Sequence, residues 1–271
     1  MTTAVFEVAR SITGRIGELE RFVLMAVREE PIDDANYGSL CRACCILLAS
    51  HLEGFLKDLT SSLTADLNFY LKSFSKLPSS LQRAFCEKIA FFDGVPKEEI
   101  DLRVRQLTEF FNENSVNINL QAFSYKEPKN KNPSADDVES VLEKIGIPSV
   151  LFSISGSKLE TVFSGDTASS YLVRREIRRY RSHLFKFPYR PLPNKYTFNY
   201  RSEKTRKSSG GASIWHTYID EVMQRRYRIA HGDTVFNETT IKALQHDIEK
   251  MEVLMHALIF SSVAYISLSD I

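Results

Sequence analysis

The chain has 271 residues, 43% of them hydrophobic and 25% charged, which is typical of a soluble globular protein. Its formal net charge of +1 excludes a strongly basic or strongly acidic protein as a whole. The charges are unevenly distributed, because residues 174–207 contain twelve Lys and Arg against two Asp and Glu. A basic block therefore interrupts an otherwise acidic chain.

We expect a cytoplasmic protein that makes no contact with a membrane. The cysteines have neither zinc-site nor disulfide-framework spacing, which favours buried, reduced thiols. The N-terminus lacks the basic start and apolar core of a signal peptide. The most apolar stretch, 254–268, contains His256 and is shorter than the ~18–20 residues of a spanning helix, so it predicts a buried helix. The cysteines are Cys41, Cys44, Cys45 and Cys86.

The N-terminal part of the sequence predicts four helices. Apolar residues recur every three or four positions through 3–28 and again through 37–74, which is the pattern of two long amphipathic helices. Pro31 and the aspartates after it separate the two helices. Two shorter helices are predicted within 79–94 and 97–113.

The middle of the sequence is less regular. Turn-forming and polar residues dominate 114–133, with room for one short strand. A helix is predicted from the Ser134 cap to Gly146. Small alternating stretches in 149–170 predict short strands, and the basic block that follows is broken by prolines. The glycines of 207–213 predict a flexible joint.

Two helices close the chain. The first covers 213–231 and is stopped by Gly232, and the second begins near Thr239. The fold prediction is a single, mainly α domain in which core helices at about 1–113 and 213–268 form a helical bundle. An irregular, basic and partly extended central insertion covers 114–212, with its basic, aromatic-rich segment at 174–207.

The tetrapeptide Arg-Arg-Tyr-Arg occurs twice, and each copy precedes a histidine. The first copy starts at Arg178, between other cations and close to prolines, so nothing in the sequence fixes its geometry. We expect mobile arginines there. They form either a solvated basic face or an RNA-binding surface, since aromatic residues interleave with the charges. The RNA-binding candidates are Arg174, Arg175, Arg178, Arg179, Arg181, Lys186 and Arg190.

The second copy lies near the end of the predicted helix 213–231, where apolar neighbours would hold the backbone rigid. Arg225 and Arg226 are in its last two turns, and His231 is at its end. An ordered backbone beside an exposed terminus suits a catalytic pair. A capping histidine beside two surface arginines is the structural alternative.

The stretch MQRRYRIAHGD resembles the signature of the HEPN superfamily, in which an arginine precedes a histidine by a few positions. Arg226 and His231 match these two residues, and Arg225 matches a frequent preceding arginine. Tyr227 departs from the pattern, since asparagine is common at that position. A second stretch, 42–59, is similar to the first core helix of MAE-type, RiboL-PSP-like HEPN proteins, with Glu53 followed by glycine and phenylalanine.

This resemblance implies a HEPN-like helical bundle and a metal-independent endoribonuclease that needs no cofactor. In such enzymes the ribose 2′-hydroxyl attacks the adjacent phosphate and leaves a 2′,3′-cyclic phosphate. The resemblance assigns phosphate binding to Arg226, proton transfer to His231 and an auxiliary phosphate contact to Arg225. Glu53 would orient one of the catalytic pair, and Tyr227 is an auxiliary candidate.

Two copies of the motif would share one cleft, which implies a homodimer. RNA is the expected partner, and the activity would be that of a toxin or antiviral effector with a neutralising or regulatory protein. Two alternatives remain open. One is a HEPN-fold protein that binds RNA or nucleotides without turnover, and the other is a purely structural helical dimer.

Overall fold

The computed structural model describes residues 2–120, 134–196, 198–200, 212–232 and 239–268. The main helices within them are α1 (Ala4–Glu29), α2 (Asp34–Tyr70), α3 (Ser79–Ala90), α4 (Lys97–Glu113), α5 (Ala135–Glu143), α6 (Val150–Ser153), α7 (Thr167–Arg179), α9 (Ile214–Ala230) and α10 (Ile241–Leu268). Short 3-10 helices include η1 (Phe74–Lys76), η3 (Lys158–Phe163), η4 (Tyr180–Leu184) and η5 (Asn194–Tyr196). The fold is mainly α, as the sequence predicts, and the described residues contain no strand.

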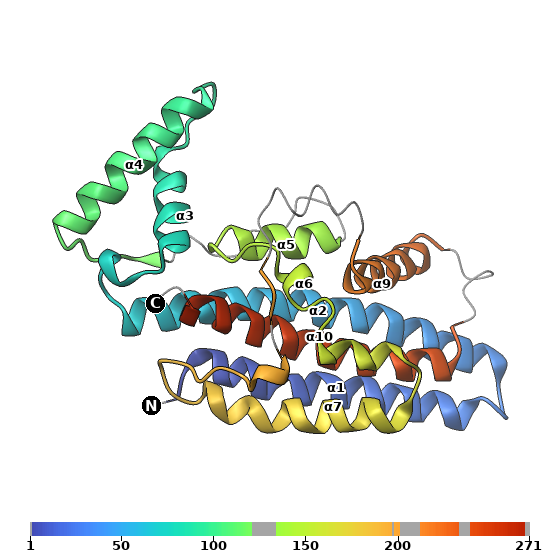
Figure 1. Ribbon diagram of the computed structural model, residues 1–271. Coiled ribbons are helices and arrows are strands. Elements are labelled where there is room, and N and C mark those ends of the chain that lie inside the picture. The colour runs from blue at the N-terminus through green and yellow to red at the C-terminus, as the bar shows by residue number, and fades with distance from the viewer. Residues whose placement is uncertain (1, 121–133, 197, 201–211, 233–238, 269–271) are drawn as a thin grey trace.

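Helices α1, α2, α7 and α10 run alongside one another and form the body of the molecule (Figure 1). The apolar face of α1 is buried against α2 and α10, which explains the periodicity of its sequence. Helix α10 is buried on all sides from Met251 to Val263, as a central helix must be. Helix α9 packs on α2, and α5 packs on α9. These contacts place the end of α9 against the surface of α2.

Helix α2 has the length and apolar composition that a membrane-crossing helix needs. Half of its most apolar window is buried inside the bundle. The side chains of Leu52, Phe55 and Leu59 are fully or almost fully enclosed by α1, α9 and α10. In this structure α2 is therefore a core helix of the bundle.

Helices α3 and α4 form a hairpin that projects from the body (Figure 1). Phe74 at its base packs against Phe85 and Phe111, and Gly146 lies so close to α3 that an added Cβ would come within 3.0 Å of the Leu81 backbone. Several large apolar side chains on the hairpin are exposed. They are Ile89, Phe91, Phe92, Leu102 and Phe110.

The strands predicted for 149–170 are wrong. This segment forms α6, η3 and the start of α7 instead. Ser149, Gly156 and Gly165 adopt left-handed backbone conformations, with φ values of 52°, 71° and 76°, and they divide the segment into short helical turns. The apparent alternation comes from these short turns, each of which buries its own apolar residues.

Other predictions for the central insertion have mixed outcomes. The segment before residue 120 contributes one isolated bridge, between Ser73 and Asn117, and residues 121–133 lie outside the described residues. Most of the predicted joint at 207–213 also lies outside them. The basic block is more ordered than expected, because its first half is α7 and η4 packed on α10 and α1.

Candidate functional site

The second Arg-Arg-Tyr-Arg copy lies at the end of an ordered helix. Ser213 begins α9 with a reciprocal capping box in which its hydroxyl and the His216 side chain satisfy free backbone groups. Trp215, Ile219 and Val222 bury one face of the helix. The helix ends at His231, where ψ becomes 12°, and Gly232 turns the chain away with φ 85°. The backbone that carries the candidate residues is therefore well defined.

Arg226 faces α2 and is held there by Glu53. Its Nη1 lies 3.2 Å from Oε1 of Glu53, and the two side chains are 26% and 30% exposed. A carboxylate at this distance fixes the direction of the guanidinium and leaves it partly accessible to solvent. Of the two candidates that Glu53 could orient, the structure places Arg226 against it.

His231 is exposed and contacts Tyr227, one helical turn earlier. The two ring centroids are 4.2 Å apart, and the ring planes are inclined by 51°. Five residues on a helix correspond to a rotation of ~140° and a rise of ~7.5 Å, so His231 points away from the α2-facing side that holds Arg226. A single chain therefore presents the arginine and the histidine on different sides of the helix end.

Arg225 is directed away from this pair. Its guanidinium donates a hydrogen bond to the carboxylate of Asp247 on α10, and its side chain is only 23% exposed. It also lines a pocket of about 340 Å³ with Glu221, His246 and Lys250. The two adjacent arginines thus have different partners, Asp247 for Arg225 and Glu53 for Arg226.

The first Arg-Arg-Tyr-Arg copy is bound to the core through Arg178, so the expected mobility of its arginines is wrong for this residue. Glu252 on α10 is completely buried. Arg178 donates to Glu252 through Nε and, at 2.7 Å, through Nη2. Arg174 donates to Glu252 at 2.7 Å and to Glu249 at 3.1 Å. Two cations thus neutralise a carboxylate that could not be buried alone.

Arg181 is bound to the same helix. Its Nε donates to Nε2 of the fully buried His256 at 2.9 Å, and its Nη1 donates to Thr13 at 2.7 Å. Because Nε2 of His256 accepts, Nδ1 carries the proton and donates to the Glu252 carbonyl at 2.7 Å. Burial and the charge of Arg181 lower the pKa of His256 to about 4. This histidine is a neutral structural group at physiological pH.

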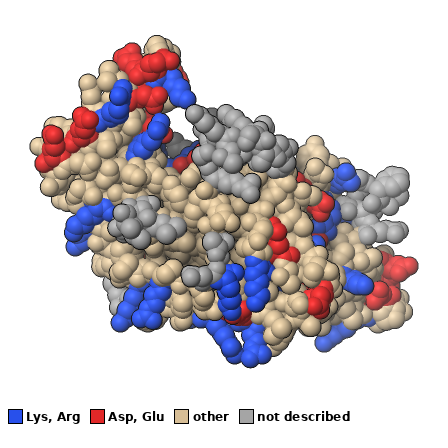
Figure 2. Space-filling view, in the orientation of Figure 1, with Lys and Arg blue, Asp and Glu red and all other residues tan. Residues whose placement is uncertain are grey.

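Four other predicted RNA contacts of the basic block are exposed. Arg175, Arg179, Lys186 and Arg190 lie on α7 and the chain that follows it. Lys and Arg side chains gather along the lower edge of the molecule, over this region (Figure 2). These four residues stay predicted RNA contacts, whereas the guanidiniums of Arg174, Arg178 and Arg181 already have partners within the chain.

The aromatic residues between these cations are mostly packed inward. Tyr189 is buried and donates to Asp66 at 2.7 Å, and Tyr196 is buried and donates to Glu176 at 2.5 Å. Phe187 stacks on Tyr70 with 4.8 Å between ring centroids. Their rings therefore fasten the basic segment to the bundle and do not offer open faces for bases.

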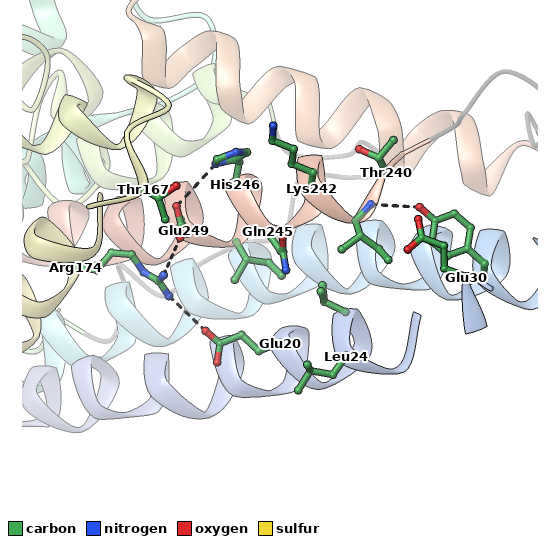
Figure 3. Close-up of a pocket in the computed structure, with 14 residues that line it drawn as sticks. Glu20, Leu24, Glu30, Thr167, Arg174, Thr240, Lys242, Gln245, His246 and Glu249 are labelled. Carbon is green, nitrogen blue, oxygen red and sulfur yellow. Dashed lines mark hydrogen bonds and ion pairs between the residues drawn. The ribbon is translucent and has the colours of Figure 1, made fainter. Parts of the chain in front are cut away.

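A pocket of about 920 Å³ lies between α1 and α10, beyond the N-terminus of α7 (Figure 3). Val23, Leu24 and Ile248 contribute apolar surface, and Arg174 and Glu249 close one end through their ion pair. Neither Arg226 nor His231 lines this pocket. The candidate pair is instead on an exposed surface at the end of α9.

No group of three metal-ligating side chains occurs among the residues that the structure describes. The four cysteines are free and buried, and burial raises the pKa of each thiol, in the case of Cys44 to about 12. Sequence reasoning missed Asp247, Glu252 and His256 as partners of the arginines. The signal was present, because these polar residues interrupt the apolar pattern of the last helix.

The described residues form the mainly α bundle that the HEPN resemblance implies, and Arg226 and His231 lie at the end of α9. The family model described as RiboL-PSP-HEPN matches residues 11–259. The chain therefore belongs to the RiboL-PSP-HEPN family, and the suspected relationship is confirmed. Membership supports a function on nucleotides or RNA. Neither the curated proteins nor the solved structures include a significant match.

Proposed function

We propose that this protein is a metal-independent endoribonuclease whose catalytic residues are Arg226 and His231. The observation that carries the proposal is the arrangement at the end of α9. There Glu53 holds Arg226 at 3.2 Å, and His231 is exposed on the same ordered helix end. Family membership supplies the second support.

The proposed reaction uses the ribose 2′-hydroxyl of the substrate as its nucleophile. The 2′ oxygen forms a bond to phosphorus, the bond to the 5′ oxygen breaks, and a 2′,3′-cyclic phosphate and a 5′-hydroxyl result. A histidine can remove the 2′ proton or donate a proton to the leaving oxygen near neutral pH. The guanidinium of Arg226 stabilises the charge that develops on the phosphate oxygens. DNA, which lacks the 2′-hydroxyl, would not be cut.

The active site of the proposed enzyme is completed by a second copy of the chain. Within one copy, Arg226 faces α2 and His231 lies ~140° around the helix. A two-fold axis beside the end of α9 would bring the arginine of one copy toward the histidine of the other. In such a homodimer an arginine and a histidine can meet at one phosphate, which the ~140° separation on a single α9 does not favour.

The proposed setting is a toxin or antiviral effector of the cytoplasm, restrained by a neutralising or regulatory partner. The buried, free thiols are compatible with a reducing compartment. Arg175, Arg179, Lys186 and Arg190 are the proposed auxiliary RNA contacts, because their side chains are exposed.

The experiment is incubation of the purified protein with total RNA in EDTA, followed by mapping of the fragment ends. The wild type should produce 2′,3′-cyclic phosphate ends, and His231→Ala and Arg226→Ala should each abolish them. His183→Ala is the matched control, since His183 follows the first copy of the tetrapeptide and should leave cleavage unchanged. Cleavage that persists in both site variants would assign the activity to a contaminant.

A non-catalytic RNA-binding protein is the second candidate function. The observation that favours it is Tyr227, an aromatic residue where the family pattern often has asparagine. In that case the protein would bind RNA with a strong salt dependence. The wild type and the His231→Ala variant would then both leave the RNA intact.

A further inference from the structure

Tyr227 is an exposed aromatic residue that touches the candidate catalytic histidine. Its side chain is 54% exposed, and its ring centroid is 4.2 Å from that of His231. Among the described residues its hydroxyl has no hydrogen-bond partner. The other exposed positions of α9 are mostly polar, including Thr217, Glu221 and Gln224. The ring therefore stands in solvent at the site, without a role in the core.

Tyr227 also lies between two arginines. Successive residues on a helix are rotated by ~100°, so its ring projects between the directions of Arg226 and Arg228. Arg228 is exposed. Cations on either side of an aromatic ring suit a nucleic acid strand in which phosphates flank an unpaired base.

We propose that Tyr227 stacks on a nucleobase next to the scissile phosphate and thereby selects single-stranded RNA. The proposal rests on the proposed function, since it requires a phosphate at Arg226 and His231. A base can present its face to the ring only when it is unstacked, as in single strands, loops and bulges. A continuous duplex hides these faces and offers Tyr227 only its sugar–phosphate surface. The tyrosine thus gives this member of the family a preference for unpaired substrate at the site.

The test measures binding of oligonucleotides that cannot be cleaved. A 2′-O-methyl single strand, the same strand in a duplex, and an abasic oligomer with the same phosphate spacing are titrated against each variant by fluorescence anisotropy. Tyr227→Phe keeps the ring and should bind the single strand as the wild type does. Tyr227→Leu loses the ring and should bind the single strand roughly 5- to 150-fold more weakly. Its affinities for the duplex and the abasic oligomer should stay unchanged.

The matched control is Phe110→Leu. Phe110 is 56% exposed, much like Tyr227, but lies on α4, away from the proposed RNA contacts. This variant should bind all three oligonucleotides as the wild type does. A Tyr227→Trp variant supplies a spectroscopic readout, because Trp215 is fully buried and reports little on added ligand. Single-stranded oligonucleotide should quench the new emission, and the abasic oligomer should not.

Equal losses for the single strand and the abasic oligomer in Tyr227→Leu would overturn the proposal, and so would no loss for either. These outcomes are distinct from failure of the proposed function, which is judged by RNA cleavage in EDTA. Selective loss of base binding without any cleavage by the wild type would support stacking and reject catalysis. Cleavage together with unchanged single-strand binding in Tyr227→Leu would support catalysis and reject stacking.

Discussion

Oε1 of Glu53 on α2 lies 3.2 Å from Nη1 of Arg226 on α9, and this ion pair joins the two stretches of sequence that resemble HEPN proteins. Residues 173 positions apart in the chain thus meet at the end of α9. The pair is partly exposed, so its contribution to stability is small, at about 0–1 kcal/mol. Its importance lies in where it directs the guanidinium.

We therefore expect Glu53→Gln to lower the cleavage rate roughly 10- to 100-fold, because a misdirected Arg226 no longer meets the phosphate. The midpoint of thermal unfolding should change little. Rates of RNA cleavage and calorimetry measure the two effects. Asp58→Asn is the control, since Asp58 pairs with Arg15 at 2.5 Å on another part of α2. A Glu53→Gln variant as active as the wild type would show that Arg226 needs no orienting carboxylate.

A mixture of two inactive variants tests the shared site. Arg226→Ala keeps His231, and His231→Ala keeps Arg226, so a dimer of one copy of each retains one arginine and one histidine. About half of the dimers in a randomly mixed sample have this composition. We expect the mixture to recover part of the wild-type cleavage rate after subunit exchange. A mixture that stays as inactive as either variant would place both residues of each site in one chain.

His256 should make stability depend on pH. Burial, followed by the charge of Arg181, lowers its folded pKa to about 4 from 6.5, so below pH 6.5 the unfolded chain binds the proton more readily. The free energy of unfolding should decrease as the pH falls from 6.5 to 4, by roughly 3 kcal/mol from this group. Urea denaturation at several pH values measures it. His256→Gln, whose amide oxygen can still accept from Arg181, should flatten the curve in this interval.

Glu252→Gln should destabilise the fold by roughly 3–5 kcal/mol, because Arg174 and Arg178 lose the buried charge between them. Glu249→Gln is the matched comparison, since Glu249 also pairs with Arg174 but its side chain is 17% exposed. We expect a smaller loss for Glu249→Gln in urea denaturation. Similar losses for the two variants would mean that burial of the carboxylate does not set the size of the effect.

Alanine substitutions at Gly146 and Gly165 separate the cost of backbone strain from the cost of a steric clash. Both have positive φ, 80° and 76°, so alanine costs roughly 1–2 kcal/mol at either position. At Gly146 an added Cβ would also come within 3.0 Å of the Leu81 backbone, whereas at Gly165 nothing lies within 4 Å. Gly146→Ala should therefore lower the free energy of unfolding more than Gly165→Ala. Equal losses would show that the backbone of α3 moves aside easily.

The long helices and their order could be predicted from the sequence because their apolar residues recur at helical spacing. The extent of α1 and the end of α9 at His231 follow from periodicity and from Gly232. The short turns of 149–165 could not be predicted, since they depend on left-handed backbone at Ser149 and two glycines. Local alternation alone does not distinguish such turns from strands.

The candidate site could be located on the chain, but its geometry depends on facing helices. Arg225 and Arg226 are neighbours in sequence, and only the position of α9 on α2, within side-chain reach of α10, directs them to Asp247 and Glu53. Likewise, Arg178 of the first tetrapeptide meets the buried carboxylate of Glu252 only because α7 packs on α10. A run of basic residues in the sequence does not show whether its arginines face solvent or pair with buried carboxylates.

The bonds between α7 and α10 also limit how this protein can be shortened or diversified. Removing α7 and η4 would leave Glu252 without Arg178 and His256 without Arg181, so an unpaired carboxylate would remain in the apolar core. We therefore expect any relative that lacks α7 to carry different residues at these two positions of its final helix. The side chains of α10 at these positions and the presence of α7 are thus coupled, and a shortened version of this chain would need both to be changed together.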